Sequence, residues 1–139
     1  MSLHLVRLLI GVVTFWNLQA AVQFMFSPHK FAPGFELSGV PGESMIQGMG
    51  LLFLMWNVPY LVALIHPLKY LTSLVEAVIM QAVGVFGETF LLLSLKGSHD
   101  LIHESVRRFI LFDSGGLILL LIALALALSV RRKVKVMGI

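Results

Sequence analysis

The chain has no cysteine and few charged residues. None of its 139 residues is cysteine, so disulfides, cysteine-ligated zinc and iron–sulfur clusters are excluded. Charged residues make up 12% of the chain, about half of the roughly 25% that is usual in soluble domains. Hydrophobic residues make up 58%. This composition is typical of a polytopic membrane protein and leaves no stretch for a separate soluble domain.

The apolar residues form four runs, each close to the roughly 20 residues that a helix needs to cross a bilayer. The runs cover residues 3–26, 45–65, 72–95 and 106–130. They predict an all-α fold in which residues 1–139 form one domain, an antiparallel bundle of four transmembrane helices. The first run is longer than the apolar core of a signal peptide, so we interpret it as a span.

The three connections between the runs differ in character. Residues 27–44 contain three prolines and three glycines, so this segment cannot be helical throughout. Residues 66–69 read as a tight turn, which makes the second and third spans antiparallel neighbours. Residues 96–105 are polar and join the last two spans.

Lysine and arginine predict the orientation of the bundle. Four spans place both chain ends on one side, which carries Arg7, Lys69 and the four basic residues of segment 131–135. The other side carries the remaining four basic residues. The positive-inside rule therefore places both termini in the cytoplasm, in a plasma membrane. The basic tail is better explained by contact with anionic lipid headgroups than by nucleic acid.

Two carboxyl groups, Glu88 and Asp113, lie within the predicted spans. A charge in hydrocarbon is costly and indicates a functional site by default. With the helical rise per residue, both fall roughly 7 Å from the midplane in the non-cytoplasmic half. Gly84 and Gly116 lie on the same helical faces as these carboxyls and permit close helix approach. We therefore expect both carboxyls to face the interior of the bundle at a similar depth.

Other polar and aromatic residues fall in the same half or near the midplane. With the two carboxyls they define a candidate ligand-binding cluster, which comprises Glu88, Asp113, Gln47, Gln19, Gln23, Asn17, Trp16, Trp56 and Asn57. Three interpretations are open: a hydrogen-bond network that only fixes helix packing, a polar cavity that binds a small molecule or lipid headgroup or carries protons, or an interface with another membrane subunit. No residue is assigned a catalytic role.

The sequence indicates no bound metal or cofactor, although a quinone or a lipid is compatible with the cluster. All five histidines lie at span ends or in connections, so haem in the bundle core is not expected. His99 and His103 are four residues apart, but one such pair in a polar connection is a weak metal signal. The sequence contains no phosphate-binding loop and no nucleophile elbow.

The chain resembles the DoxX-like group of small four-helix membrane proteins. The resemblance is carried by Arg7-Leu8-Leu9-Ile10-Gly11, by the loop with Pro28 and Phe31, and by the glycine pairs Gly48-Met49-Gly50 and Gly115-Gly116. It implies a four-helix membrane fold, with links to quinone-coupled oxidation and to assembly of larger membrane proteins. Glu76-Ala77-Val78 and Glu88-Thr89-Phe90 depart from the family's Glu-Leu-x-x-Gly pattern, so no site residue is carried over.

Two functions are compatible with these observations. The first is an accessory or binding protein whose polar pocket, in the non-cytoplasmic half, holds a lipid-like molecule, a small ligand or a partner membrane protein. The second is a small membrane enzyme, an isomerase or a quinone-linked oxidoreductase component, in which Glu88 and Asp113 act as acid and base.

The topology can be tested with single cysteines, because the natural chain has none. We expect a Ser98→Cys variant to be labelled by an impermeant thiol reagent in intact cells, and a Gly138→Cys variant to be protected. The reverse labelling pattern would move the polar cluster to the inner leaflet.

Overall fold

The computed structural model describes residues 3–136 and is built from helices. The helices are α1 (Leu3–Phe26), α2 (Gly39–Trp56), α3 (Val58–Ile65), α4 (Leu71–Ser94) and α5 (Asp100–Val136), with no strand among the described residues. Helices α2 and α3 follow one another as a single span, so four spans are long and apolar enough to cross a membrane. The expected all-α bundle of four transmembrane helices is confirmed, and the chain is an integral membrane protein.

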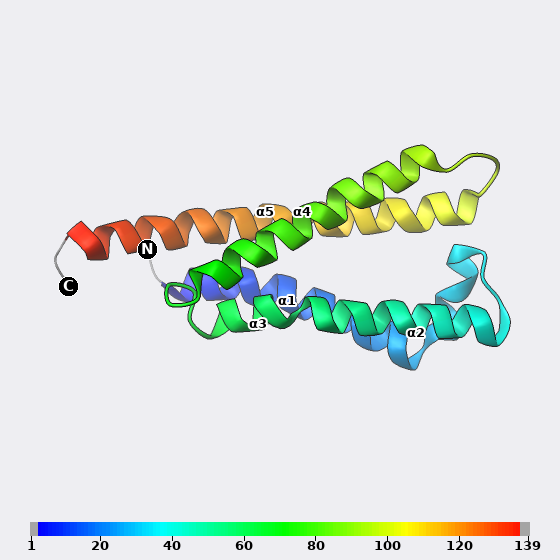
Figure 1. Ribbon diagram of the computed structural model, residues 1–139, viewed down its shortest axis with the longest axis horizontal. Coiled ribbons are helices and arrows are strands. Elements are labelled where there is room, and N and C mark those ends of the chain that lie inside the picture. Colours follow the sequence, from blue (N-terminus) through cyan, green and yellow to red (C-terminus); the bar gives the residue numbers. More distant parts are fainter. Residues whose placement is uncertain (1–2, 137–139) are drawn as a thin grey trace.

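The four spans form two layers (Figure 1). Helices α4 and α5 pack along each other in one layer, and α1 packs beside α2 and α3 in the other. The start of α1 and the end of α5 lie at one end of the molecule, which we call the terminal end. Two short 3-10 helices, η1 (Pro28–Lys30) and η2 (Ala32–Phe35), lie at the opposite end, where η2 contacts α5.

The core is divided along the length of the bundle. At the terminal end the buried residues are aliphatic, and Val6, Ile10, Leu74 and Leu120 are at most 1% exposed. At the opposite end a smaller cluster forms around Phe24 and other phenylalanines. The aliphatic half therefore closes by tight packing, whereas the aromatic half leaves space between the layers.

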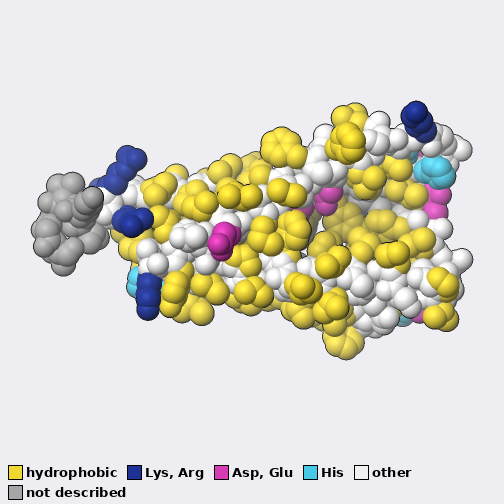
Figure 2. All heavy atoms as spheres, in the orientation of Figure 1, with side chains coloured by type: hydrophobic (Ala, Val, Ile, Leu, Met, Phe, Trp, Pro, Cys, Tyr) yellow, Lys and Arg dark blue, Asp and Glu magenta, His cyan; other side chains and the backbone are white. Residues whose placement is uncertain are grey.

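The outside of the helices is apolar, as lipid contact requires. Large side chains such as Phe86 and Leu93 are 72% and 79% exposed. Figure 2 shows hydrophobic side chains along the whole flank of the bundle, with most of the visible lysines and arginines gathered near the terminal end. A soluble protein would not expose so much continuous apolar surface.

Pro59 accounts for the break between α2 and α3. Proline has no N–H to donate to the preceding turn, so it interrupts the helical hydrogen bonds. The N–H of Asn57 turns to the carbonyl of Leu54 at 3.2 Å, and its side-chain Nδ2 donates to the carbonyl of Phe53 at 2.7 Å. Asn57 thus satisfies a carbonyl that the break would leave without a donor, as the apolar surroundings require.

Two helices begin earlier than the apolar runs suggest. The second span starts at Gly39 rather than residue 45, because Pro41 falls in the first helical turn, where an N–H needs no partner. The fourth starts at Asp100 rather than residue 106, so the polar segment 100–105 forms its first turns. Of the basic tail, the side chain of Lys135 lies outside the described residues, as does Gly138.

Gly50 and Gly48 of α2 provide a matched test of helix packing. A Cβ on Gly50 would lie 2.8 Å from the backbone oxygen of Ala21 in α1, whereas a Cβ on Gly48 would meet no atom within 4 Å. We expect Gly50→Ala to lower the free energy of unfolding by about 1–3 kcal/mol through overpacking. Gly48→Ala should change it by less than about 0.5 kcal/mol. Thermal unfolding in detergent, followed by circular dichroism, measures the difference, and equal values would contradict this close approach of α1 and α2.

Candidate functional site

A cavity of about 470 Å³ lies in the aromatic half of the bundle. All four spans contribute to its walls, and residues of η1 and η2 line its end. Figure 2 shows the surface hollowed in this half of the molecule, away from the terminal end. Much of the lining is aromatic and consists of Phe24, Phe31, Phe35, Phe53, Trp56, Phe109 and Phe112. The volume falls within the range of about 300–1,000 Å³ that is usual for small-molecule pockets.

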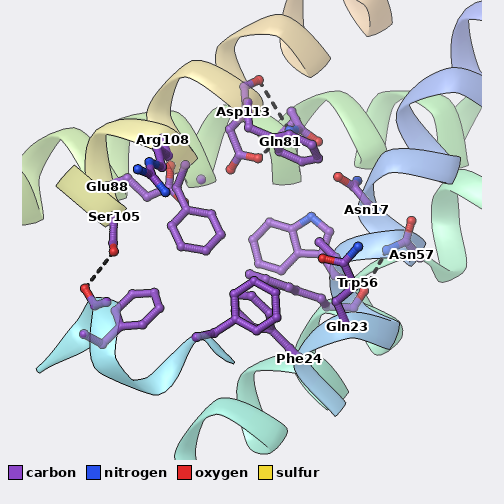
Figure 3. A pocket seen from close by; sticks show the side chains of 18 of the residues that line it. Asn17, Gln23, Phe24, Trp56, Asn57, Gln81, Glu88, Ser105, Arg108 and Asp113 are labelled. Atoms are coloured by element: carbon purple, nitrogen blue, oxygen red, sulfur yellow. Dashed lines mark hydrogen bonds between the residues drawn. The ribbon is translucent and has the colours of Figure 1, made fainter. Parts of the chain in front are cut away.

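A chain of hydrogen bonds links residues of four helices, and Figure 3 shows its last link, between Gln81 and Asp113, at the cavity wall. Trp56 Nε1 donates to the hydroxyl of Tyr60 at 3.2 Å, and this hydroxyl donates to Oε1 of Gln81 at 2.6 Å. Gln81 Nε2 then donates to Oδ1 of Asp113 at 2.9 Å and lies 3.3 Å from the backbone oxygen of the same residue. This relay ties α2 and α3 to α4 and α5, and its last donor, Gln81 Nε2, points at Asp113.

Glycines on α4 and α5 make room for this contact. A Cβ on Gly84 would clash with Oδ2 of Asp113, and a Cβ on Gly116 would lie 2.8 Å from Nε2 of Gln81. Since Asp113 packs at the level of Gly84, Glu88 lies about one helical turn, or roughly 6 Å, nearer the end formed by η1 and η2. Both carboxyls line the cavity, offset by one turn along it rather than at one level.

Two buried oxygen atoms of the cavity lining have no hydrogen-bond partner. They are Oε2 of Glu88 and Oδ1 of Asn57. The side chain of Asn57 is fully buried, and its Nδ2 is already used on the Phe53 carbonyl. Buried polar atoms in hydrocarbon are normally satisfied, so such exceptions need an explanation.

Basic and hydroxyl groups lie at the end of the cavity that η1 and η2 form. Lys30, Ser105 and Arg108 line it there, and Arg108 pairs with Glu104 of the same helix. The cluster predicted from the sequence did not include Arg108. Arg108 follows Ser105 by three residues on α5, and Ser105 is bonded to Gly34 of η2, so both side chains lie at the end of the cavity that η1 and η2 form.

The segment that contains η1 and η2 is tied down over this end. Ser105 Oγ donates to the carbonyl of Gly34 at 2.7 Å. His99 Nδ1 lies 2.7 Å from Oε2 of Glu36, just after η2. Phe31 and Phe35 reach from this segment into the aromatic cluster. The prolines of this segment end α1 and fold the chain back over the cavity.

The structure brings six of the nine predicted cluster residues to the cavity. These are Asn17, Gln23, Trp56, Asn57, Glu88 and Asp113. The other three do not line the cavity. Trp16 is 39% exposed and packs against Phe112 from outside the cavity, Gln19 is exposed, and Gln47 is exposed and donates to the carbonyl of Met25.

Helix geometry explains the residues that do not join the cluster. Asn17 is buried, and Gln19, two positions later, points about 200° away around the helix. The two side chains cannot both face the interior. On α2, Ile46 is fully buried and faces the core, so its neighbour Gln47 is turned outward. The glycine faces of α4 and α5 indicated which way Glu88 and Asp113 point, but the sequence did not reveal the buried faces of α1 and α2.

The most important residues that the cluster prediction omitted are Gln81 and Tyr60. Both are buried, at 2% and 0% exposed. Gln81 lies on the stripe of Gly84 and Glu88, which was the available signal for it. Tyr60 follows Pro59 in an apolar run, and no pattern distinguishes its hydroxyl from ordinary core.

No protein-family model, no curated protein and no solved structure matches this chain. The fold and the cavity therefore define its class by themselves. It is a four-helix integral membrane protein with a pocket of aromatic and polar side chains in one half of the bundle.

The relay can be tested at its central hydroxyl. We expect Tyr60→Phe to lower the free energy of unfolding by about 1–2 kcal/mol, because Trp56 Nε1 and Gln81 Oε1 would both lose their partner inside the bundle. Tyr70→Phe is the control, since Tyr70 lies in the turn before α4 and outside the relay. It should change stability by less than about 0.5 kcal/mol. Chemical unfolding in detergent would measure both, and equal effects would contradict the relay.

Proposed function

We propose that the protein is a binding or accessory protein of the membrane, and that its cavity holds a small lipophilic molecule with one polar end. The apolar body would lie against the phenylalanines and Trp56. The polar end would meet Glu88 and Asp113. A lipid or a quinone is compatible in size with a pocket of about 470 Å³.

The observation that carries this proposal is the pair of unpartnered buried oxygens in the cavity lining. A network that served packing alone would satisfy its own members, as the relay through Gln81 does. Glu88 Oε2 and Asn57 Oδ1 are instead left without partners. Unsatisfied polar groups cost free energy, which a bound molecule would recover if these side chains turned toward it.

The orientation of the pocket follows from the charge distribution. We propose that both termini are cytoplasmic and that the membrane is a plasma membrane, which directs the end formed by η1 and η2 to the non-cytoplasmic side. A ligand would then enter from that side or from the outer leaflet. A partner membrane subunit could receive or supply the ligand there, which is the accessory role in its simplest form.

A second candidate is a small membrane enzyme. The observation in its favour is that Glu88 and Asp113 line the same cavity one helical turn apart, as an acid and a base acting on one bound molecule would. A Glu88→Gln variant separates the two functions. A binding protein would lose affinity in proportion to the altered hydrogen bond, whereas an enzyme would keep its substrate and lose turnover.

Filling the cavity tests the proposed function. Ala20 lines the cavity, so Ala20→Trp should occupy much of its volume. Val22, on the same helix, is 50% exposed, and Val22→Trp places an equal side chain outside the cavity. Native mass spectrometry of protein extracted from its own membrane should show a retained small molecule in the natural protein and in Val22→Trp. Ala20→Trp should lose it, and equal retention in both variants would refute binding in this cavity.

A further inference from the structure

The contacts between the four spans form a ring that is closed only in the aliphatic half. The second span, α2 with α3, packs on α1, α1 packs on α5, and α5 packs on α4. The ring is completed where α3 packs on α4, at the level where the Tyr60 hydroxyl donates to Gln81. Among the described residues, α2 and α4 do not pack along each other. In the aromatic half the ring is therefore open on one side.

The open side of the ring lies over the cavity. The lining includes residues from both edges of the opening, which are Phe53, Trp56 and Asn57 of α2 and Gln81, Gly84 and Glu88 of α4. Figure 1 shows α4 running away from α2 toward the end formed by η1 and η2. Figure 2, in the same orientation, shows the surface hollowed between these two helices. The cavity thus opens through the flank of the bundle.

The flank at this opening faces lipid. Both α2 and α4 belong to membrane spans, so the medium around them is the hydrocarbon of the bilayer. Leu52 of α2 precedes Phe53 of the lining, and Val83 of α4 precedes Gly84, and both of these large apolar side chains are exposed. A lipid-dissolved molecule can therefore reach the opening without passing through water.

The end of the cavity that η1 and η2 form is held shut by contacts with α5. Ser105 Oγ donates to the carbonyl of Gly34 at 2.7 Å, and a Cβ on Gly34 would lie 2.9 Å from the same Oγ. The rings of Phe35 in η2 and Phe109 in α5 have their centroids 6.0 Å apart. Entry at this end would require these contacts to break, whereas no such contact spans the flank between α2 and α4 among the described residues.

From this we infer the route by which a ligand reaches the cavity, which rests on the proposed function. We propose that the ligand enters sideways from the bilayer, through the opening between α2 and α4, and that it is a compound dissolved in the hydrocarbon. The lining combines carboxyls and amides with Lys30 and Arg108, so it can satisfy donors and acceptors alike. The route makes the selection, because a permanently charged molecule of the same shape would have to enter hydrocarbon first, at a high cost.

Two covalent locks distinguish the two routes, since the natural chain contains no cysteine. The first lock pairs Gly34→Cys with Ser105→Cys, two positions already in contact, and its disulfide ties η2 to α5. The second lock pairs Phe53→Cys with Glu88→Cys, and a bismaleimide bridges the two cysteines across the flank. Phe53 and Glu88 line the cavity from α2 and α4, respectively.

The second pair is matched in depth by the bond between Tyr60 and Gln81. Phe53 precedes Tyr60 by seven residues, and Glu88 follows Gln81 by seven. Because α2 and α4 run in opposite directions, both positions lie about two helical turns from that bond, toward the end formed by η1 and η2. A bridge between them therefore crosses the opening at one level.

Loading is measured with a naphthoquinone that carries a decyl chain, added to proteoliposomes. In a Trp16→Phe background Trp56 is the only tryptophan, and it lines the cavity, so saturable quenching of its fluorescence reports arrival of the probe. We expect the bismaleimide bridge to slow loading roughly tenfold or more relative to the same variant before bridging, because entry must then wait for the helices to move. The disulfide lock should leave the rate within about twofold of its reduced form.

Three results would overturn the lateral route. They are slower loading with the disulfide lock, an unchanged rate after bridging, and saturable quenching by a naphthoquinone sulfonate added to both faces of the membrane. The sulfonate has the same ring system with a permanent charge, and we expect no saturable quenching from it. If the bridged variant does not fold or the bridge does not form, the disulfide lock and the comparison of the two compounds decide.

The same measurements separate the route from the proposed function. If the decyl compound binds with saturation but the disulfide lock slows its loading, the cavity is a binding site and only the lateral route fails. If the decyl compound gives no saturable quenching, the lateral route fails, and native mass spectrometry of the natural protein decides the rest. A retained small molecule would leave the proposed function standing, and its absence would refute it.

Discussion

The contact between Gln81 and Asp113 is the interaction on which the arrangement of the site depends. It joins α4 to α5 within the membrane-spanning helices, where a lost polar partner is costly. It requires small residues around it, because Cβ atoms at Gly84 and Gly116 would occupy the space of Asp113 and Gln81. The close approach of these two helices and the position of the carboxyl inside the bundle are therefore two consequences of one contact.

The break at Asn57 gives the opposite layer its part in the site. In a continuous helix through residues 39–65, each backbone carbonyl would accept a bond from the backbone. No buried side-chain amide would then be needed as a donor. Because Pro59 interrupts that ladder, the Asn57 side chain is held at the break by the Phe53 carbonyl, with its oxygen facing no partner. The same irregularity places Trp56 and Tyr60 one turn apart in the relay. A local backbone defect thus positions Trp56 and Asn57 in the cavity lining, with Tyr60 bonded to Trp56.

The two halves of the bundle differ in packing, and only the aromatic half encloses the cavity described above. In the aliphatic half, side chains of Val, Ile, Leu and Ala fill the space between helices and leave no lining for a ligand. In the aromatic half, bulky phenylalanines hold the layers apart, and the segment of η1 and η2 closes the end through Ser105 and Glu36. A pocket lined by aromatic and polar side chains is the outcome of this division.

The sequence by itself determined the class of the protein, its four spans and the two carboxyls that a bilayer makes expensive. These follow from sums over local residues, since transfer into hydrocarbon depends on composition and length more than on neighbours. Only the tertiary structure decided which face of each helix is buried. It left Trp16, Gln19 and Gln47 out of the cavity lining and added Gln81, Phe31 and Phe35, with Tyr60 bonded to Gln81. Helix rotation and register are set by contacts between residues far apart in the chain, here the glycine contacts of α4 with α5 and of α1 with α2, which no local pattern encodes.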